Sequence, residues 1–353
     1  MYTREIQIPV ESPVKDGKPI QGTWVRPFNR VQLLDIARPY SLPLPKWAAY
    51  LRVKEWQSFL VQNDEVYFES VTANFKFFRF IEAVILDKKN GKIKHYFDYF
   101  PFTLAFWELP ESLTNNFVGF RTLGYSMSIH NWLDAALIKF SFKVDSMEDL
   151  PELIVDFEIN LGAKKSPPMV TNLLFTEDRP VYTYKNMGEV TGHISLGEDS
   201  CYTLEAKSTL GMFRDCKGLF PFITRGEWIN AFGTLKDGRI IGFSMSENQA
   251  KSANKDNENV LWAGDSFTPL PPVHITHDTG FSEDWVIEDV EGMVDLSFTP
   301  QQNIEKKGFD FILAKAEFRN PTGCFNGMVK TADGEEIVIH NLSGCAESLF
   351  LRL

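Results

Sequence analysis

The sequence predicts an all-β protein built from antiparallel strands. Apolar and polar residues alternate with a period of two along much of the chain, as between Asn63 and Tyr99, and this alternation is typical of strands with two different faces. Asn-Gly and Asp-Gly pairs in "KKNGK", "LKDGR" and "TADGEE" stand between alternating segments, where tight hairpin turns need positive φ. Helical periodicity is scarce, and its best candidates are the short segments 28–37 and 115–124.

The chain length predicts two domains. With 353 residues it exceeds the roughly 100–200 residues of a typical domain. The segment "GAKKSPPMV", residues 162–170, interrupts the strand pattern with paired prolines and charge, so we expect domains at 1–168 and 169–353. Each half would then hold enough strands for a small barrel, and a barrel of about eight strands can hold one small ligand.

Composition narrows the classes of function. A net charge of −11 opposes the phosphate backbone, which argues against nucleic acid as a partner. No apolar run is long enough for a membrane helix and the first residues are charged, so we expect no transmembrane segment and a cytoplasmic location. The four cysteines are scattered, and zinc spacings, phosphate loops, dinucleotide motifs and the G-x-S-x-G elbow are absent. We therefore predict free buried thiols, no metal and no cofactor.

The segment "GLFPFITRGEWINAFG" places charges among aromatic residues. On a strand, Arg225 and Glu227 share one face, whereas Trp228 and Asn230 share the other. Arg225 and Glu227 can form a structural ion pair, or both can point at a ligand, with Glu227 as a candidate catalytic carboxyl. Trp228 and Asn230 suit an interface between two barrels, because the indole and the amide each need a partner.

The segment "NFKFFRFIEAVILD" presents a similar pattern in the first half. Arg79 shares a face with Phe77 and Ile81, and Glu82 shares the other with Phe80. A carboxyl in apolar surroundings has a raised pKa and can donate a proton near neutral pH, so Glu82 is a candidate catalytic acid. The alternatives for Glu82 are a salt bridge and a strand-edge position in water.

A third candidate site lies in "NKDNENVLWAGD". Glu258, Asn259 and Trp262 bring a carboxylate, an amide and an indole close together in sequence. This combination is typical of small-molecule and sugar sites, although clusters of Asn and Asp also form turns.

Several motifs together resemble one known family. The run from Tyr182 to Phe232, with "YTYKNMGEVTGHI" and "RDCKGLFPFITRGEWINAFG", is followed by "NENVLWAGD", "VDLSFTP" and "GCFNGMVKTADGEEIVIHNLSGCAE". This ordered set resembles the bacterial domain-of-unknown-function family numbered 2804 over nearly the whole chain. That family is similar to the AttH and carotenoid-hydratase-like group. The resemblance implies an all-β fold of two lipocalin-like, calycin-like antiparallel barrels side by side, with few short helices.

The resemblance also implies site residues. The family motifs fall on three groups of positions, which are Asp215, Gly218, Pro221, Arg225, Trp228 and Asn230, then Glu258 and Asn259, and finally Gly327, Gly344 and Glu347. One departure is that Cys216-Lys217-Gly218 stands where family members tend to have Gly-Arg-Gly. Lysine keeps the charge but lacks the bidentate fork of arginine, which weakens any carboxylate or phosphate contact there.

These observations predict a pocket for an apolar or amphipathic small molecule. The candidate ligand-binding residues are Arg79, Asp215, Arg225, Trp228, Asn230, Glu258, Asn259 and Trp262. The resemblance to hydratases suggests cofactor-independent hydratase or isomerase chemistry, in which a carboxyl such as Glu82 or Glu227 protonates carbon. Two alternatives stay open. A carbohydrate-active enzyme needs paired pocket carboxylates, and a non-catalytic carrier or scaffold would have every pocket charge paired.

Overall fold

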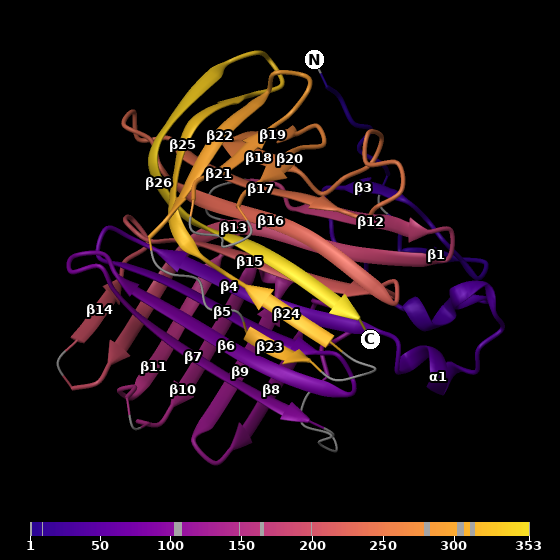
Figure 1. The fold of residues 1–353 in the computed structure, drawn as a ribbon, viewed down its shortest axis with the longest axis horizontal. Helices are drawn as coiled ribbons and strands as arrows, with labels where there is room; N and C mark the ends of the chain where they lie inside the picture. The colour runs from indigo at the N-terminus through magenta and orange to yellow at the C-terminus, as the bar shows by residue number, and fades with distance from the viewer. Residues whose placement is uncertain are drawn as a thin grey trace.

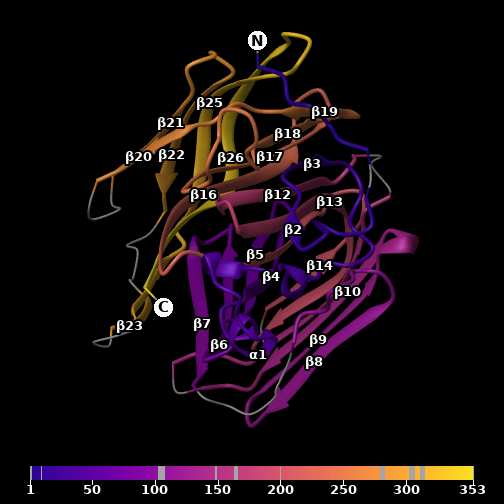
Figure 2. The ribbon, with the colours of Figure 1, turned by 90° about the vertical axis from the view of Figure 1, so that its right-hand side faces the viewer.

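Two large curled antiparallel sheets make up most of the molecule (Figure 1). The computed structural model describes residues 2–8, 10–101, 108–147, 149–162, 166–198, 200–278, 283–301, 307–310 and 315–352. Nearly all of its regular structure is β-strand, which confirms the all-β prediction. Viewed from the side, the two sheets lie one above the other, with the first residues of the chain running along their edge (Figure 2).

The first sheet has 13 strands in the described part of the chain. Its main path runs in the order β7, β6, β5, β4, β15, β13, β11, β10, β9, β8, and β12, β14 and β3 pair beside it. The bounds are β3 (Gly22–Trp24), β4 (Lys54–Gln62), β5 (Val66–Asn74), β6 (Phe78–Asp87), β7 (Lys92–Pro101), β8 (Asn116–Thr122), β9 (Tyr125–Trp132), β10 (Leu137–Val144), β11 (Leu153–Asn160), β12 (Met169–Thr176), β13 (Arg179–Leu196), β14 (Ser200–Leu204) and β15 (Leu210–Gly218).

The second sheet has 11 strands among the described residues, with the main order β19, β18, β17, β16, β26, β25, β22, β21, β20. The strands β23 and β24 pair at its side, next to β26. The bounds are β16 (Ile223–Thr234), β17 (Ile240–Asn248), β18 (Val260–Ala263), β19 (Ser266–Pro269), β20 (His274–Thr276), β21 (Trp285–Glu288), β22 (Val294–Pro300), β23 (Lys307–Asp310), β24 (Lys315–Arg319), β25 (Thr322–Lys330) and β26 (Glu336–Arg352).

The change from one sheet to the other falls between Gly218 and Ile223, where β15 ends and β16 begins. The strand β12 begins at Met169, inside the expected linker at 162–170, and β12 to β15 still belong to the first sheet. The division into domains 1–168 and 169–353 stays a prediction, and it does not coincide with the division between the sheets.

Helices are few and short, as predicted. Among the described residues they are α1 (Lys46–Tyr50) and three 3-10 turns, η1 (Leu33–Asp35), η2 (Pro39–Ser41) and η3 (Leu133–Ala135). The strands β1 (Val14–Lys15) and β2 (Lys18–Pro19) form a small hairpin. The helix expected at 115–124 is wrong, because β8 occupies this segment and Val118 and Phe120 are buried at a spacing of two. The segment 28–37 contains only η1. No helix in the described ranges is long and apolar enough to cross a membrane.

Each curled sheet encloses its own apolar core. Phe59 in β4 and Phe140 in β10 have ring centroids 4.5 Å apart, although three strands separate β4 from β10 in the sheet. The first sheet must therefore curl around its inner face. In the second sheet, Phe243, Phe298 and Phe325 pack together in the same way. Aromatic side chains thus pack the middle of both interiors.

Candidate functional site

A pocket lies between the two sheets, on the face of the first sheet that points away from its core. It holds about 880 Å³ of empty space, counting its open mouth. The first sheet contributes residues from β4, β5, β6, β12, β13 and β15, and the second from β16, β17, β24 and β26. The lining residues are Trp56, Val71, Phe75, Phe80, Glu82, Leu173, Phe175, Val181, Thr183, Lys185, Arg214, Cys216, Phe220, Trp228, Asn248, Glu258, Phe318, Asn320, Glu347, Ser348 and Leu349.

Strand register sets these side chains in rows across the first sheet. One row crosses five neighbouring strands through the pairs Glu82 with Val71, Val71 with Ser58, Ser58 with Arg214, and Arg214 with Lys185. Residues that face each other across a ladder point to the same side of the sheet. This ionic row therefore forms one border of the pocket.

The next row along the same strands is mainly apolar. It passes from Phe80 through Trp56 and Cys216 to Thr183. The Trp56 ring stacks on Phe220 with centroids 5.5 Å apart and an interplanar angle of 27°. This aromatic row gives the pocket its apolar wall, and stacked rings of this kind suit an apolar ligand surface.

The second sheet covers this face with a matching arrangement. Trp228 in β16 pairs across the ladder with Glu347 in β26, so the indole and the carboxylate leave the same face. A Cβ built on Gly226 would lie only 2.5 Å from the Trp228 ring. Glycine at position 226 therefore allows the indole to fold back along its own strand into the pocket.

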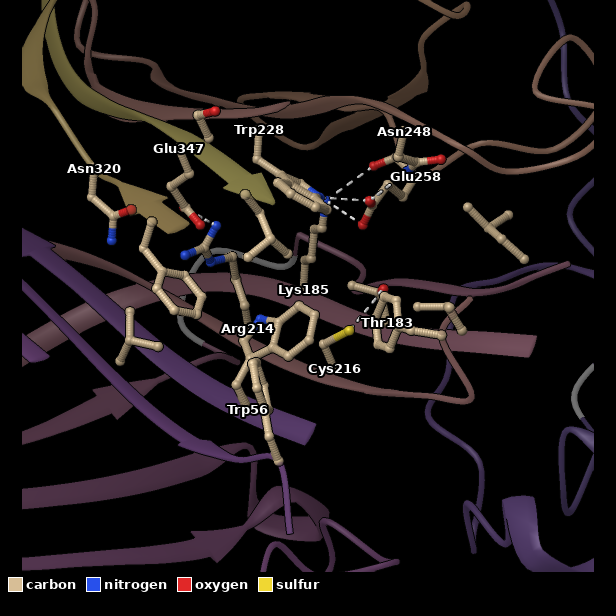
Figure 3. Close-up of a pocket in the computed structure, with 18 of the residues that line it drawn as sticks. Trp56, Thr183, Lys185, Arg214, Cys216, Trp228, Asn248, Glu258, Asn320 and Glu347 are labelled. Carbon is tan, nitrogen blue, oxygen red and sulfur yellow. Dashed lines mark hydrogen bonds and ion pairs between the residues drawn. The ribbon is translucent and has the colours of Figure 1, made fainter. Parts of the chain in front are cut away.

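One end of the ionic row is a buried ion pair between the sheets. Lys185 Nζ lies 2.9 Å from Glu258 Oε2, and both side chains are almost fully buried. Trp228 Nε1 donates to Glu258 Oε1 at 2.8 Å, and Asn248 donates to the same oxygen (Figure 3). Ser246 is a third donor to this oxygen. Although burial opposes ionisation, the Lys185 ammonium and these donors hold the pKa of Glu258 below its usual value.

The middle of the ionic row joins the sheets through Arg214. Its guanidinium forms an ion pair with Glu347 (Figure 3). It also lies 3.7 Å from Glu69 Oε1. Burial, and secondarily the negative charge of Glu347, raises the pKa of Glu69 to about 8. Oxygen and sulfur atoms of Glu69, Cys345 and Glu347 lie within 4.8 Å of one another. Because the guanidinium of Arg214 already supplies a positive charge to this group, the geometry favours an ion-pair network over a metal site.

The surroundings of Glu82 correct the direction of the pKa shift that the sequence predicts for it. It lines the pocket and is buried, but its expected raised pKa is wrong. Lys307 Nζ lies 2.6 Å and His95 Nε2 2.9 Å from its Oε1, and Asn320 donates to Oε2. Burial alone would raise the pKa, but Lys307 and His95 outweigh it and lower the pKa of Glu82 to about 2. Glu82 is therefore an ionised, paired carboxylate and not a proton donor at neutral pH.

Arg225 and Glu227 lie outside this pocket. Arg225 is exposed, with its guanidinium 5.3 Å from the Phe350 ring centroid. Glu227 accepts a hydrogen bond from Ser348 and lies 3.6 Å from His277 Nε2. Neither of the sequence alternatives describes them well, because Glu227 is bound to Ser348 and His277 in place of Arg225.

Arg79 and Asp215 belong to the inner face of the first sheet. Arg79 stands two residues before Ile81 on β6 and therefore shares its face, and Ile81 belongs to the first core. Asp215 accepts a hydrogen bond from Gln57 at 2.8 Å, and burial raises its pKa to about 6. The pocket lies on the opposite face, so these two residues are separated from Glu258 and Trp228.

Of the remaining predicted residues, Asn230 and Trp262 lie between the sheets, and Asn259 directly precedes β18. Asn230 donates to Glu347 at 3.0 Å and accepts from Ser244, as expected for an amide at an interface. Asn259 fixes its own loop through Ser246 and Pro271. Trp262 is fully buried, and its indole donates to the carbonyl of Pro167. Of the ten predicted residues, only Glu82, Trp228 and Glu258 line the pocket.

Sequence reasoning missed the two cations of the ionic row and the first-sheet aromatic wall. Lys185 stands in "YTYKNMGEV", a segment that carries the family resemblance, and Arg214 directly precedes the motif residue Asp215. A lysine or arginine at an otherwise apolar position of a strand is the signal that could have found them. Trp56 gives no such signal, because aromatic residues occur throughout this sequence.

A protein-family model matches nearly the whole chain. A sequence model described as "Domain of unknown function (DUF2804)" matches residues 3–353. The chain belongs to this family. The family resemblance seen in the sequence is thereby confirmed, and no curated protein matches.

Two solved structures are similar to the chain at low sequence identity. An AttH-like protein from Nitrosomonas europaea has 12% identity and a TM-score of 0.43, with 84% of this chain and 92% of that chain covered. Kievitone hydratase from Nectria haematococca has 10% identity and a TM-score of 0.48, with 85% of this chain and 88% of that chain covered.

Proposed function

We propose that the pocket between the sheets binds a largely apolar or amphipathic small molecule. The observation that carries this proposal is the combination of an aromatic wall with an ionic border whose charges are already paired. Trp56, Phe80 and Phe220 offer apolar surface, while polar groups at the border can orient a ligand.

The pairing of the pocket charges supports binding over chemistry. Glu82 pairs with Lys307, Glu258 with Lys185, and Glu347 with Arg214. A carboxylate held in an ion pair is a poor proton donor at neutral pH. This arrangement is the one expected of a carrier, and it gives no support to carbohydrate hydrolysis, which needs one carboxyl with a raised pKa facing the pocket.

A neutral apolar fluorophore tests the proposal. We expect N-phenyl-1-naphthylamine to bind saturably with increased fluorescence, because the pocket wall shields it from water. Leu349 lines the pocket from β26. The substitution Leu349→Trp should fill part of the space and weaken binding about 10-fold or more.

The matched control is Val338→Trp, which adds the same ring to an exposed position on the same strand. It should leave the affinity within about two-fold of the wild type. Equal binding to the wild type and Leu349→Trp would place the fluorophore elsewhere and contradict the proposal. Native mass spectrometry of freshly purified protein would then identify the natural ligand class.

A second candidate function is cofactor-independent proton transfer to a double bond. The observation that favours it is Glu69, whose pKa of about 8 keeps a proton available beside Glu347, which faces the pocket. Delivered to an alkene carbon, this proton would leave a cation to which water adds, and the added water returns a proton. Infrared spectra at pH 7 should show the carbonyl band of a protonated carboxylic acid that Glu69→Gln removes. Its absence from the wild type would remove this candidate.

A further inference from the structure

Three cations gather beside the aromatic end of the pocket. The guanidinium carbons of Arg52 and Arg179 lie 5.1 and 4.2 Å from the ring centroid of Tyr40. Tyr40 in turn donates its hydroxyl hydrogen to the carbonyl oxygen of Phe220 at 3.0 Å. Because the Phe220 ring lines the pocket, the same residue joins the pocket wall to this group of cations.

Strand register brings Lys54 to the same place. Lys54 lies opposite Gly218 on the ladder between β4 and β15, one row from Trp56 and Cys216. A Cβ on Gly218 would meet the Phe220 ring at 2.6 Å, so this row faces the pocket aromatics. Lys54 is 3% exposed. It therefore leaves the sheet on the pocket face, at the edge of the apolar wall.

Arg179 extends the pocket face of a neighbouring strand. It begins β13 two residues before Val181, and Val181 and Thr183 both line the pocket. Alternate residues of a strand share a face, so Arg179 follows the same row. The cationic cluster, defined here as Arg52, Lys54 and Arg179, thus lies just beyond the pocket lining, at the end opposite to the ionic row.

These cations differ from the two cations of the ionic row in having no carboxylate partner. Within the described ranges, no ion pair joins Arg52, Lys54 or Arg179 to an acidic group, whereas Lys185 and Arg214 each pair with a glutamate. Asp178 lies nearby, but its carboxylate accepts from Ser41 and Thr176. In a chain with 47 acidic and 36 basic residues, three clustered cations without a carboxylate partner form a site complementary to an anion.

We propose that the cationic cluster binds the oxyanion head of an amphipathic ligand whose apolar chain occupies the pocket. This inference rests on the proposed binding function and adds the charge of the ligand to it. Arginine forks and a lysine ammonium are the groups that proteins use for carboxylate, sulfonate and phosphate oxygens. The Tyr40 ring holds both guanidinium groups in place through cation–π contacts.

Dodecanesulfonate and 1-dodecanol test this inference, because they share an apolar chain and differ in the head. Displacement of N-phenyl-1-naphthylamine gives the affinity of each. The double substitution Lys54→Met/Arg179→Met should weaken dodecanesulfonate about 10-fold or more and leave 1-dodecanol within about two-fold. The single substitution Arg179→Met, at a half-buried residue, serves if the double variant fails to fold.

The control variant Arg121→Met/Lys236→Met removes the same charge from two exposed positions and should change neither affinity. Equal weakening of both probes, or no weakening of dodecanesulfonate, would overturn the inference. Inorganic sulfate alone distinguishes a free anion from an amphiphile. Tight sulfate binding that depends on Lys54, without competition against the fluorophore, would also overturn it.

The two proposals fail in different ways. If Leu349→Trp leaves the binding of 1-dodecanol unchanged, the pocket does not hold the chain and the proposed function fails. If 1-dodecanol requires the pocket but the sulfonate head gains nothing from Lys54 and Arg179, only the inference about the anionic head fails.

Discussion

The two ends of the pocket solve the problem of buried charge differently. At the ionic row, Lys185 and Arg214 each meet a glutamate from the second sheet, so a charge from one sheet neutralises a charge from the other. At the cationic cluster, Lys54 and Arg179 meet no carboxylate among the described residues. Paired charges join the two sheets, whereas cations without a carboxylate partner remain available to a ligand.

Stability should separate the two ends most clearly. Lys185→Met leaves Glu258 buried without its cation, so we expect the free energy of unfolding to fall by about 3–5 kcal/mol. Lys54→Met removes a buried ammonium that has no carboxylate partner, so stability at pH 6 should stay the same or rise by about 1 kcal/mol. Thermal or urea unfolding measures both.

The pH dependence of the free energy of unfolding gives the sign of the effect of Lys54→Met. Burial, followed by the nearby charge of Arg52, lowers the pKa of Lys54 to about 7, below its ordinary 10.5. The cost of burying the ammonium is therefore fully present below pH 7 and fades as pH rises toward 10.5. The gain in stability from Lys54→Met should fade in the same way.

A matched control for Lys185→Met is Lys185→Met/Glu258→Gln, which removes both ionised partners and should recover part of the lost stability. A loss from Lys54→Met as large as that from Lys185→Met would contradict the distinction between the two ends.

Much of the fold could be predicted from local pattern. Alternation and Asn-Gly or Asp-Gly turns depend on neighbouring residues, and they correctly indicated antiparallel strands. The same pattern placed Trp228 and Asn230 on one face, and both lie between the sheets. The position of Val118 and Phe120 shows the limit, since a short apolar segment reads equally well as a helix or a strand.

The candidate site was harder to predict because its partners are distant in sequence. Glu82 has its pKa lowered by Lys307, which is 225 positions away, and nothing near Glu82 in the sequence announces this lysine. Burial alone therefore suggested the opposite direction of the pKa shift. Similarly, Lys54 and Arg179 come together only because β4 and β13 both pair with β15.

The smallest expected effect is a change with pH in the affinity for dodecanesulfonate, which we assign to the cationic cluster and not to the ionic row. Arg52 acts on Lys54 directly, and the other charged and titratable groups at the cationic cluster are Arg179, Tyr40 and Asp178. Burial raises the pKa of Tyr40, and hydrogen bonds lower that of Asp178 despite burial, so neither changes charge between pH 6 and 8. Lys54 is the group of this cluster that loses its proton in that range. Dodecanesulfonate should therefore bind about 3–10-fold more weakly at pH 8.5 than at pH 6.

Lys54→Arg tests whether Lys54 causes this change. A guanidinium stays charged throughout the range, so the affinity of Lys54→Arg for dodecanesulfonate should be nearly constant from pH 6 to 8.5. The affinity for 1-dodecanol should not depend on pH in either protein, because its head is uncharged. An equal pH dependence in the wild type and Lys54→Arg would assign the titration to another group. Because a sulfonate stays ionised throughout, any change in its binding must come from the protein. Glu69, beside Arg214 at the ionic row, also ionises in this range because its pKa is about 8, and any effect of Glu69 would persist in Lys54→Arg.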